Sequence, residues 1–458
     1  MYYQRIIDKY LEEWMKDEER KPLLLRGARQ VGKSTAVRHL AEKFDIFVEI
    51  NFEKMPEYKA VFEQNLNVER IVSEIGALAD KEFVIGKTLL FLDEIQMCPK
   101  AIMALRFFKE DMRQLHVVAA GSLLEFVLED LPTFGVGRIH SMYMYPMTFD
   151  EFLTAQGNQQ LIKLRNQATA ESPLQNIIHD KLVKLFRIYM LVGGMPEVVD
   201  RWVRTQDYIQ CQQLQDDIVV SYEDDFPKYR KRIDPILLRA TLYNTAIQAS
   251  SKFVYSKVGD YKASEVKEAL RLLSMAGLIV CATRTGANGI PLGGEADSSF
   301  RKYFPLDPGL MMRMLRLSDG DAKALTSLIL TGEDSEVVNK GPMAEMIAGL
   351  EMLRYKTPRL RHELYYWVRM ERNSVAEVDY VEAVSGNVLP IEIKAGTQGG
   401  MKSLWMFLRQ KRLSRAVRCS LENFGKIIRP DQENPDIEYH ISICPLYAIS
   451  QLQRLLAE

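Results

Sequence analysis

The chain has 458 residues, of which 26% are charged and 47% are hydrophobic. This length suggests about two to four domains, each able to bury a core, and the composition excludes wholesale disorder. Lys and Arg number 60 against 61 Asp and Glu, so the net charge of -1 argues against a generally basic, nucleic-acid-coating surface. It leaves room for a local basic face.

Neither a membrane span nor a secretion signal is predicted. The longest run without Asp, Glu, Lys or Arg is residues 439–453, which is shorter than the ~20 apolar residues of a membrane-spanning helix. The N-terminal residues mix acids with apolar residues and do not form a signal peptide. Five cysteines lie far apart without a CxxC pair, so the sequence indicates neither a zinc site nor a disulfide framework, and we expect a cytoplasmic protein.

The first 155 residues are predicted to alternate strands with helices. Residues with the apolar spacing of helices lie at 37–44 and 101–112. Short apolar runs typical of buried strands occupy residues 22–25, 46–50, 88–92 and 117–120. Buried strands that alternate with helices favour a parallel sheet covered on both faces.

The pattern changes twice after residue 150. Residues 150–230 are predicted to be helical, with a break at Gly193, Gly194 and Pro196. Residues 235–283 suit several short helices followed by a β-wing, and the turn-rich residues 285–299 form either a wing loop or a linker. A third pattern begins at residue 341, with helices predicted at 343–353 and 402–412 and strands at 363–369, 376–384 and 388–394.

A phosphate-binding loop is predicted at residues 27–35, because GARQVGKST matches G-x-x-x-x-G-K-[ST] in full. Glycines let backbone N–H groups cradle phosphate oxygens, and the following helix presents its positive end to them. Lys33 can reach the β- and γ-phosphates, and the Ser34 hydroxyl can ligate Mg²⁺. The alternative is a glycine turn before an ordinary helix. The motif predicts that ATP and Mg²⁺ bind at Gly27, Ala28, Arg29, Gln30, Val31, Gly32, Lys33, Ser34 and Thr35.

Two acids follow the apolar run at residues 88–92. A carboxylate at the end of a buried strand is costly unless it meets a cation. We therefore expect Asp93 to hold the Mg²⁺, mostly through water, and Glu94 to polarise the attacking water. In the alternative interpretation, both acids cap the next helix.

Two further residues are candidates for catalysis. Ser122 follows the strand-like residues 117–120 and would sense the γ-phosphate or orient water, unless it is only a helix N-cap. Arg138 lies between a glycine-rich turn and strand-like residues. It would be an arginine finger, in cis or across a homo-oligomer boundary, unless it only forms a surface salt bridge.

Together GARQVGKST, LLFLDEIQ, AAGS, GRIHSMYMYPMTFDEF and GGMPEVV resemble the AAA-type ATPases of a large bacterial and archaeal family with a C-terminal nuclease-fold domain. The resemblance spans most of the chain and implies an α/β fold with ATP hydrolysis, but no pathway. It divides the chain into a P-loop ATPase core at 1–155, a helical lid at 156–232, a winged-helix unit at 233–299 and a nuclease-like domain at 300–458.

The C-terminal part resembles the PD-(D/E)XK signature of restriction-endonuclease-like folds. Asp379 precedes Glu392 and Lys394 within predicted strands, and Glu345 matches a carboxylate often found on the preceding helix. Neighbouring strands would let Asp379 and Glu392 share a divalent metal, with Lys394 orienting water or stabilising charge. The E-x-K triplet recurs elsewhere in the chain, so the domain is alternatively a relic used for binding.

Basic residues gather between residues 402 and 429, with Trp405, Phe407 and Phe424 among them. A positive face beside a metal site suits a phosphate backbone, and the alternative is a solvated helix face. The leading hypothesis is a DNA-associated ATPase coupled to the nuclease-like domain. The second is an ATP-dependent switch that binds a protein partner without cleavage, and a small-molecule kinase is the third.

Overall fold

The computed structural model describes residues 2–122, 124–130, 137–230, 232–315, 340–371, 374–396, 400–431 and 434–455. The chain forms two compact units. The first comprises Met1–Met147, Met275–Leu278 and Thr357–Arg361, and the second comprises Thr148–Ser274, Ile279–Lys356 and His362–Glu458.

A five-stranded parallel sheet forms the centre of the first unit. Its strands stand in the order β2-β3-β4-β1-β5, so the segments that follow β1, β3 and β4 emerge at one edge. The four predicted strands are confirmed, and β5 is added beside β1. The strands are β1 (Leu23–Arg26), β2 (Ile46–Asn51), β3 (Thr88–Asp93), β4 (His116–Ala120) and β5 (His140–Tyr143).

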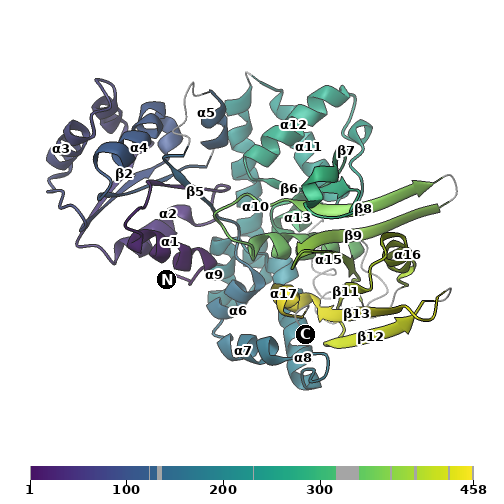
Figure 1. Cartoon of the computed structure of the whole chain (residues 1–458). Coiled ribbons are helices and arrows are strands. Elements are labelled where there is room, and N and C mark those ends of the chain that lie inside the picture. Colours follow the sequence, from purple (N-terminus) through teal and green to yellow (C-terminus); the bar gives the residue numbers. More distant parts are fainter. Residues whose placement is uncertain are drawn as a thin grey trace. The chain divides into compact units, whose positions relative to one another are not determined.

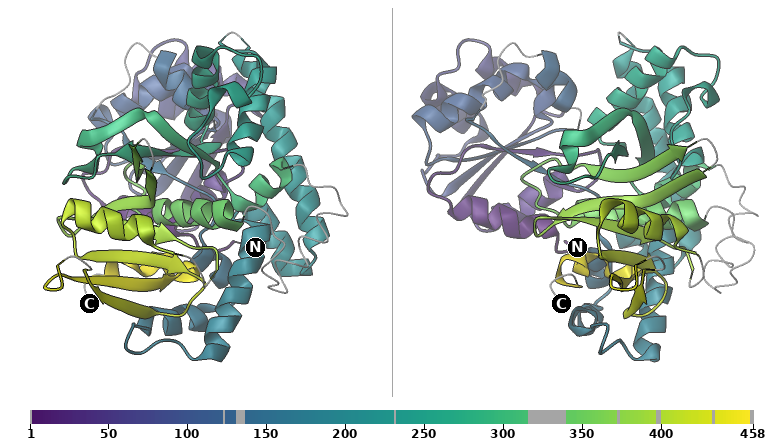
Figure 2. Two further views of the ribbon diagram at one scale, coloured as in Figure 1. Left: turned by 90° about the vertical axis from the view of Figure 1, so that its right-hand side faces the viewer. Right: turned by 45° about the vertical axis from the view of Figure 1, so that its right-hand side comes forward.

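Helices cover both faces of this sheet, as predicted. Figures 1 and 2 show α1 and α2 on one side and α3 and α4 on the other. All six residues of β3 are buried, because apolar helix faces pack on it from both sides. The helices are α1 (Ile6–Lys16), α2 (Lys33–Ala41), α3 (Val68–Ala79), α4 (Pro99–Asp111) and α5 (Leu124–Asp130), with the 3-10 turns η1 (Pro56–Phe62) and η2 (Ile95–Met97).

The second unit begins with a run of helices, which confirms the helical prediction for residues 150–230. Gly193 has a φ of 72° and ends α8, and Pro196 begins α9, so the predicted break joins two helices. The helices are α6 (Phe149–Ala155), α7 (Gln159–Gln167), α8 (Asn176–Val192), α9 (Pro196–Thr205), α10 (Tyr208–Asp225), η3 (Phe226–Tyr229), α11 (Pro235–Ile247), η4 (Tyr255–Lys257), α12 (Ala263–Met275) and α13 (Pro308–Met314).

A mixed eight-stranded sheet completes the second unit. Its order is β12-β13-β11-β10-β9-β8-β6-β7. The strands are β6 (Ile279–Thr285), β7 (Ala296–Pro305), β8 (Leu364–Glu371), β9 (Ser374–Val384), β10 (Asn387–Ile393), β11 (Arg415–Ser420), β12 (Gly425–Pro430) and β13 (Glu438–Pro445). The helices around it are η5 (Leu292–Glu295), α15 (Lys340–Arg354), α16 (Lys402–Lys411), η6 (Leu446–Gln451) and α17 (Leu452–Leu455).

The hairpin expected as a wing belongs to this larger sheet. Strands β6 and β7 pair antiparallel, and β6 also pairs in parallel with β8, where Ala282 lies opposite Leu364. The boundary predicted between residues 299 and 300 therefore falls inside β7. β6 pairs with β7 along one side and with β8 along the other, so its backbone hydrogen bonds are satisfied on both sides. Because β8 lies far along the chain, the local sequence pattern did not reveal this second pairing.

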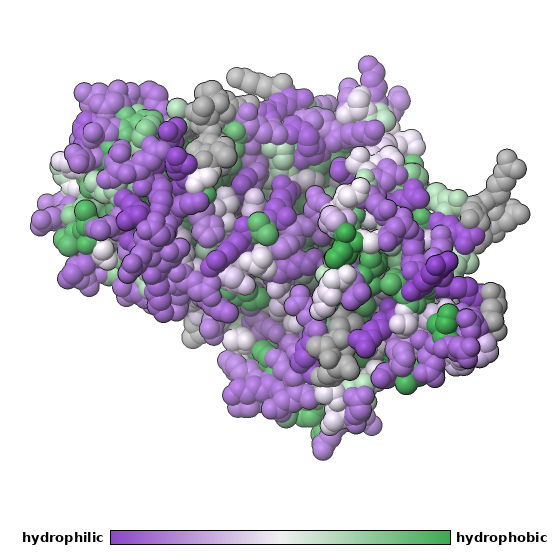
Figure 3. Space-filling model, in the orientation of Figure 1, coloured by the Kyte–Doolittle hydropathy of each residue, from purple (hydrophilic) through white to green (hydrophobic). Residues whose placement is uncertain are grey.

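None of the described helices is both long and apolar enough to cross a membrane. Figure 3 shows hydrophilic side chains over most of the face drawn, with hydrophobic side chains in small scattered groups.

Candidate functional site

The predicted phosphate loop joins β1 to α2. Its backbone has positive φ at Gly27 (146°), Gln30 (66°) and Gly32 (98°), a conformation that glycine adopts without steric cost. A Cβ on Gly27 would lie 2.2 Å from the Met144 carbonyl oxygen, so a side chain at this position would collide with the segment that follows β5. Gly27 and Gly32 thus allow the backbone path at the two ends of the loop, and the loop leads directly into the N-terminus of α2.

Lys33 is buried within this loop. Its Nζ donates hydrogen bonds to the carbonyl oxygens of Gly27 at 2.9 Å and Ala28 at 2.7 Å. Burial lowers the pKa of Lys33 to about 8, although the negative charges of Glu94 and Asp93 oppose this shift.

Asp93 and Ser34 meet at the end of β3. The Ser34 hydroxyl lies 3.0 Å from both carboxylate oxygens of Asp93, whose residue is only 4% exposed. The side chain of Asn51 also donates to Asp93 at 3.1 Å. Sequence reasoning missed Asn51, although it is the polar residue that ends β2 and lies opposite Asp93 in the sheet. This group of oxygens has the hard-donor chemistry that Mg²⁺ prefers.

Glu94 follows directly and is oriented by a glutamine. It precedes η2, but its side chain makes no capping hydrogen bond there. Its carboxylate instead accepts a hydrogen bond from the Gln96 side chain. A Cβ on Gly121 would lie 2.1 Å from Gln96 Oε1, so the glycine after β4 makes room for this glutamine. The capping alternative does not describe Glu94 in this structure.

Ser122 and Arg138 have different surroundings. Ser122 is half-buried and lies two residues after β4, at the sheet edge where the segments after β1 and β3 also emerge. The Arg138 guanidinium is half exposed and pairs with Glu110 of α4 at 3.2 Å. This pairing is the surface salt bridge considered from the sequence. The finger role stays a prediction.

The predicted nuclease-like residues lie on α15, on β9, on β10 and directly after β10. Glu345 and Asp379 come together, and the Ile393 backbone N–H donates to Asp379 at 2.7 Å. Glu392 is engaged elsewhere, because Lys394 Nζ lies 2.6 Å from its Oε1. Burial raises the pKa of Glu345 to about 8 and that of Glu392 to about 7.

Two residues that the sequence did not single out join this group. Among the described residues, Glu345, Glu377 and Asp379 bring carboxylate oxygens within 4.8 Å of one another. Lys302, from β7, pairs with Glu345 at 2.7 Å and also with Glu377. The ammonium of Lys302 therefore already neutralises part of the negative charge of Glu345 and Glu377. The metal role of Asp379 and Glu392 stays a prediction.

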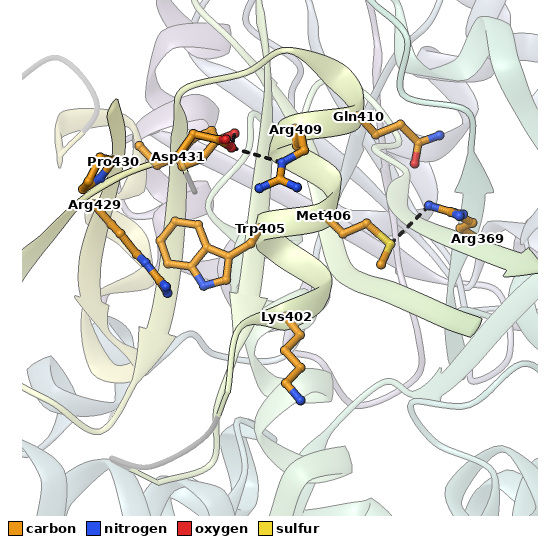
Figure 4. A pocket seen from close by; sticks show the side chains of 10 residues that line it. Arg369, Lys402, Trp405, Met406, Arg409, Gln410, Arg429, Pro430 and Asp431 are labelled. Carbon is orange, nitrogen blue, oxygen red and sulfur yellow. Dashed lines mark hydrogen bonds and ion pairs between the residues drawn. The ribbon is translucent and has the colours of Figure 1, made fainter. Parts of the chain in front are cut away.

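A second candidate site is a basic pocket of about 640 Å³ beside α16. Figure 4 shows Trp405 between Arg429 and the other side chains of α16, with Lys402 at the start of the helix. The Arg429 guanidinium lies 5.6 Å from the Trp405 ring centroid. The pocket is lined by Arg369, Lys402, Trp405, Met406, Arg409, Gln410, Arg429, Pro430, Asp431 and Tyr439.

The basic pocket and the carboxylate group lie on opposite faces of the sheet. Arg369 of β8 donates to the Met406 sulfur of α16, on the face that buries Val378 against that helix. Glu377 and Asp379 alternate with Val378 along β9 and point the other way, toward Lys302 and Glu345. The pocket therefore lies on the face of the sheet opposite Glu377 and Asp379, because side chains alternate along a strand.

Other basic residues are already engaged. Lys411 donates to Asn288 at 2.6 Å, and buried Arg418 pairs with Glu422 at 3.1 Å. Outside this stretch, Arg271 of α12 pairs with Glu268 of the same helix at 2.8 Å. Of the basic residues between 402 and 429, Lys402, Arg409 and Arg429 line the pocket.

Three known domains match successive parts of the chain. Residues 19–153 match an AAA domain, residues 183–321 match a domain of unknown function (DUF8612), and residues 340–449 match another (DUF4143). The AAA match contains the phosphate loop, Asp93 and Glu94. It supports an AAA-type P-loop ATPase core. Comparison with curated proteins gives no match.

Similar solved structures include the Walker-type ATPase of Pyrococcus abyssi, at 14% identity and a TM-score of 0.44, with 69% of this chain and 96% of that one covered. PCH-2 of C. elegans is 12% identical, with 45% and 64% covered and a TM-score of 0.26. A Signal Transduction ATPase with Numerous Domains (STAND) protein of Pyrococcus horikoshii, with a tetratricopeptide repeat sensor, is 10% identical, with a TM-score of 0.26. That match covers 76% of this chain and 49% of the Pyrococcus horikoshii protein.

Proposed function

We propose that the chain binds MgATP at the phosphate loop and hydrolyses it. The observation that carries this proposal is the meeting of Ser34, at the start of α2, with Asp93, at the end of β3. A hydroxyl and a carboxylate placed beside a glycine-rich anion cradle supply the protein ligands of a phosphate-bound Mg²⁺. The AAA match at residues 19–153 supports the same function.

Each residue has a distinct role in this proposal. The backbone of residues 27–35 holds the phosphates, and Lys33 exchanges its hydrogen bonds to Gly27 and Ala28 for phosphate oxygens. Ser34 and Asp93 would hold the Mg²⁺, which would supply positive charge to the developing phosphate charge. Glu94, oriented by Gln96, accepts the proton of the attacking water or polarises it. Ser122 would orient water or sense the γ-phosphate.

The test is ATP hydrolysis by the full chain with Mg²⁺, measured without DNA and with single- or double-stranded DNA. Turnover is expected, and DNA should stimulate it if the nucleotide cycle is coupled to DNA. Absence of turnover under all three conditions contradicts the ATPase. Turnover that is indifferent to DNA favours a switch that binds a protein partner.

A pH dependence follows from the buried state of Lys33. The ammonium form binds phosphate, and its pKa in the free chain is about 8. The kcat/KM for ATP should therefore be constant below this pH and fall about tenfold per pH unit above it. At saturating ATP, kcat should fall only at higher pH, because bound phosphate favours the charged lysine. A kcat/KM profile that stays flat through pH 8, measured at constant MgATP, contradicts this assignment.

DNA association is the finer part of the proposal, and the basic pocket supports it. Trp405 offers an aromatic face for a base, and Lys402, Arg369 and Arg429 surround it with positive charge. Asp431, the acid among the described residues of the lining, already accepts from Arg409 at 3.1 Å and from the Tyr439 hydroxyl. An aromatic platform beside cations is suited to a single strand, whose bases are free to stack.

Substituting Trp405 with alanine is therefore expected to weaken single-stranded DNA binding roughly tenfold or more, because a base loses its stacking partner. Trp405→Phe should retain most of the affinity. Lys402→Ala should reduce the slope of log affinity against log salt by about 0.7, as one phosphate contact is lost. Fluorescence anisotropy with labelled oligonucleotide at several salt concentrations measures both effects.

The matched control for Lys402 is Lys100→Ala, an exposed lysine that pairs with Glu63 in the first unit and should leave binding unchanged. Equal affinity of the wild type, Trp405→Ala and Lys402→Ala for DNA would remove the pocket from the proposal. Binding of an acidic protein instead of DNA would favour the partner switch.

A further inference from the structure

Lys302 is a buried cation at the centre of the nuclease-like carboxylates. Its side chain is 0% exposed, and its Nζ lies 2.7 Å from Glu345 Oε1 and also pairs with Glu377. The same Nζ is 4.8 Å from the centroid of the Tyr366 ring. A buried ammonium is costly unless charged partners surround it, and here two carboxylates and an aromatic face do so.

These partners are the groups that a divalent metal would use. Glu345, Glu377 and Asp379 hold oxygens within 4.8 Å of one another, a spacing that would suit several ligands of one ion. Lys302 already occupies an oxygen of Glu345 and one of Glu377. Its charge would also repel a second cation at short range in a buried setting.

We propose that Lys302 substitutes for the divalent metal in this site, so that the nuclease-like domain does not cleave nucleic acid and serves as a binding domain. The ammonium supplies the positive charge that compensates the carboxylates. It has no open coordination position at which water could be activated, which metal-dependent hydrolysis requires.

Two further observations support this proposal. Glu392, the second acid of the signature, pairs with Lys394 and stands outside the carboxylate group, and its Oε2 is buried without a hydrogen-bond partner. The basic pocket opens on the opposite face of the sheet, so a strand bound there is not presented to Asp379. The inference is independent of the proposed ATPase, because Lys33 and Asp93 lie in the other unit.

The test is Mn²⁺ binding to the full chain without nucleotide, followed through the electron paramagnetic resonance signal of free Mn²⁺. Mn²⁺ is suitable because carboxylate and water ligands accept it. Wild type and Asp379→Asn are expected to bind equal amounts, since any ion at the phosphate loop is common to both. Lys302→Met removes the charge while keeping a long side chain. It should gain about one ion per chain, which Lys302→Met with Asp379→Asn should lose again.

Lys356→Met is the matched control and should gain no ion, because Lys356 pairs with Glu382 of β9 at 2.8 Å, outside the carboxylate group. Mn²⁺ bound by the wild type and lost in Asp379→Asn would overturn the proposal, as would Mn²⁺-dependent nicking of DNA lost in the same variant. A folded Lys302→Met that gains no ion would also count against it. If Lys302→Met does not fold, the comparison of wild type with Asp379→Asn still decides the question.

Discussion

Replacing Lys33 with alanine is expected to reduce ATP hydrolysis by roughly 100-fold or more, because a positioned donor to the transferring phosphoryl group is lost. The lysine is buried in the loop, and no other residue of GARQVGKST can place an ammonium at the β- and γ-phosphates. Phosphate release at saturating MgATP measures the effect, and calorimetric titration with ATP reports the loss of binding.

Lys87→Ala is the matched control, since Lys87 is an exposed lysine of the same unit that pairs with Asp45 at 3.0 Å. It should hydrolyse ATP like the wild type. Thermal melting followed by circular dichroism checks that Lys33→Ala remains folded, because its hydrogen bonds to Gly27 and Ala28 are lost. Wild-type turnover in folded Lys33→Ala would remove the phosphate loop from the proposed mechanism.

Glu94→Gln should bind ATP but turn it over about 100-fold or more slowly. The amide keeps the size of the side chain but cannot accept a proton from the attacking water, a role worth about 10²–10⁴ in rate. The Glu94 side chain does not cap η2 and accepts a hydrogen bond from Gln96 instead, so the substitution removes no helix cap. Equilibrium binding of ATP beside single-turnover hydrolysis separates the two effects.

Glu42→Gln serves as its control, because Glu42 directly follows α2 and forms an exposed pair with His39 at 3.3 Å. The control should hydrolyse ATP normally. If Glu94→Gln also hydrolyses normally, Glu94 has no part in activating water. If Glu94→Gln loses ATP binding, Glu94 acts in holding the nucleotide rather than in the chemical step.

Much of the first unit could be predicted because its signals are local. Apolar runs bounded by polar residues placed four strands, and the alternation with helices indicated a parallel sheet. The phosphate loop is one continuous motif, and two of its three residues with positive φ are glycines. The strand-like residues after Arg138 form β5, a strand of four residues whose place beside β1 the sequence did not give. Asn51 was missed because its role depends on Asp93 in the neighbouring strand.

The sequence by itself determined the phosphate loop, the acids after β3, and the helices and strands between residues 340 and 412. These depend on residue types at short, regular spacings. Only the tertiary structure decided that Glu94 bonds to Gln96, that the basic pocket and the carboxylates occupy opposite faces, and that Lys302 enters the carboxylate group. Lys302 is 43 residues from Glu345 and 75 from Glu377, and a sheet of eight strands brings them together. A buried ammonium is stable only beside carboxylates, so Lys302 is buried where these acids lie. A local sequence pattern cannot predict a contact between residues so far apart in the chain.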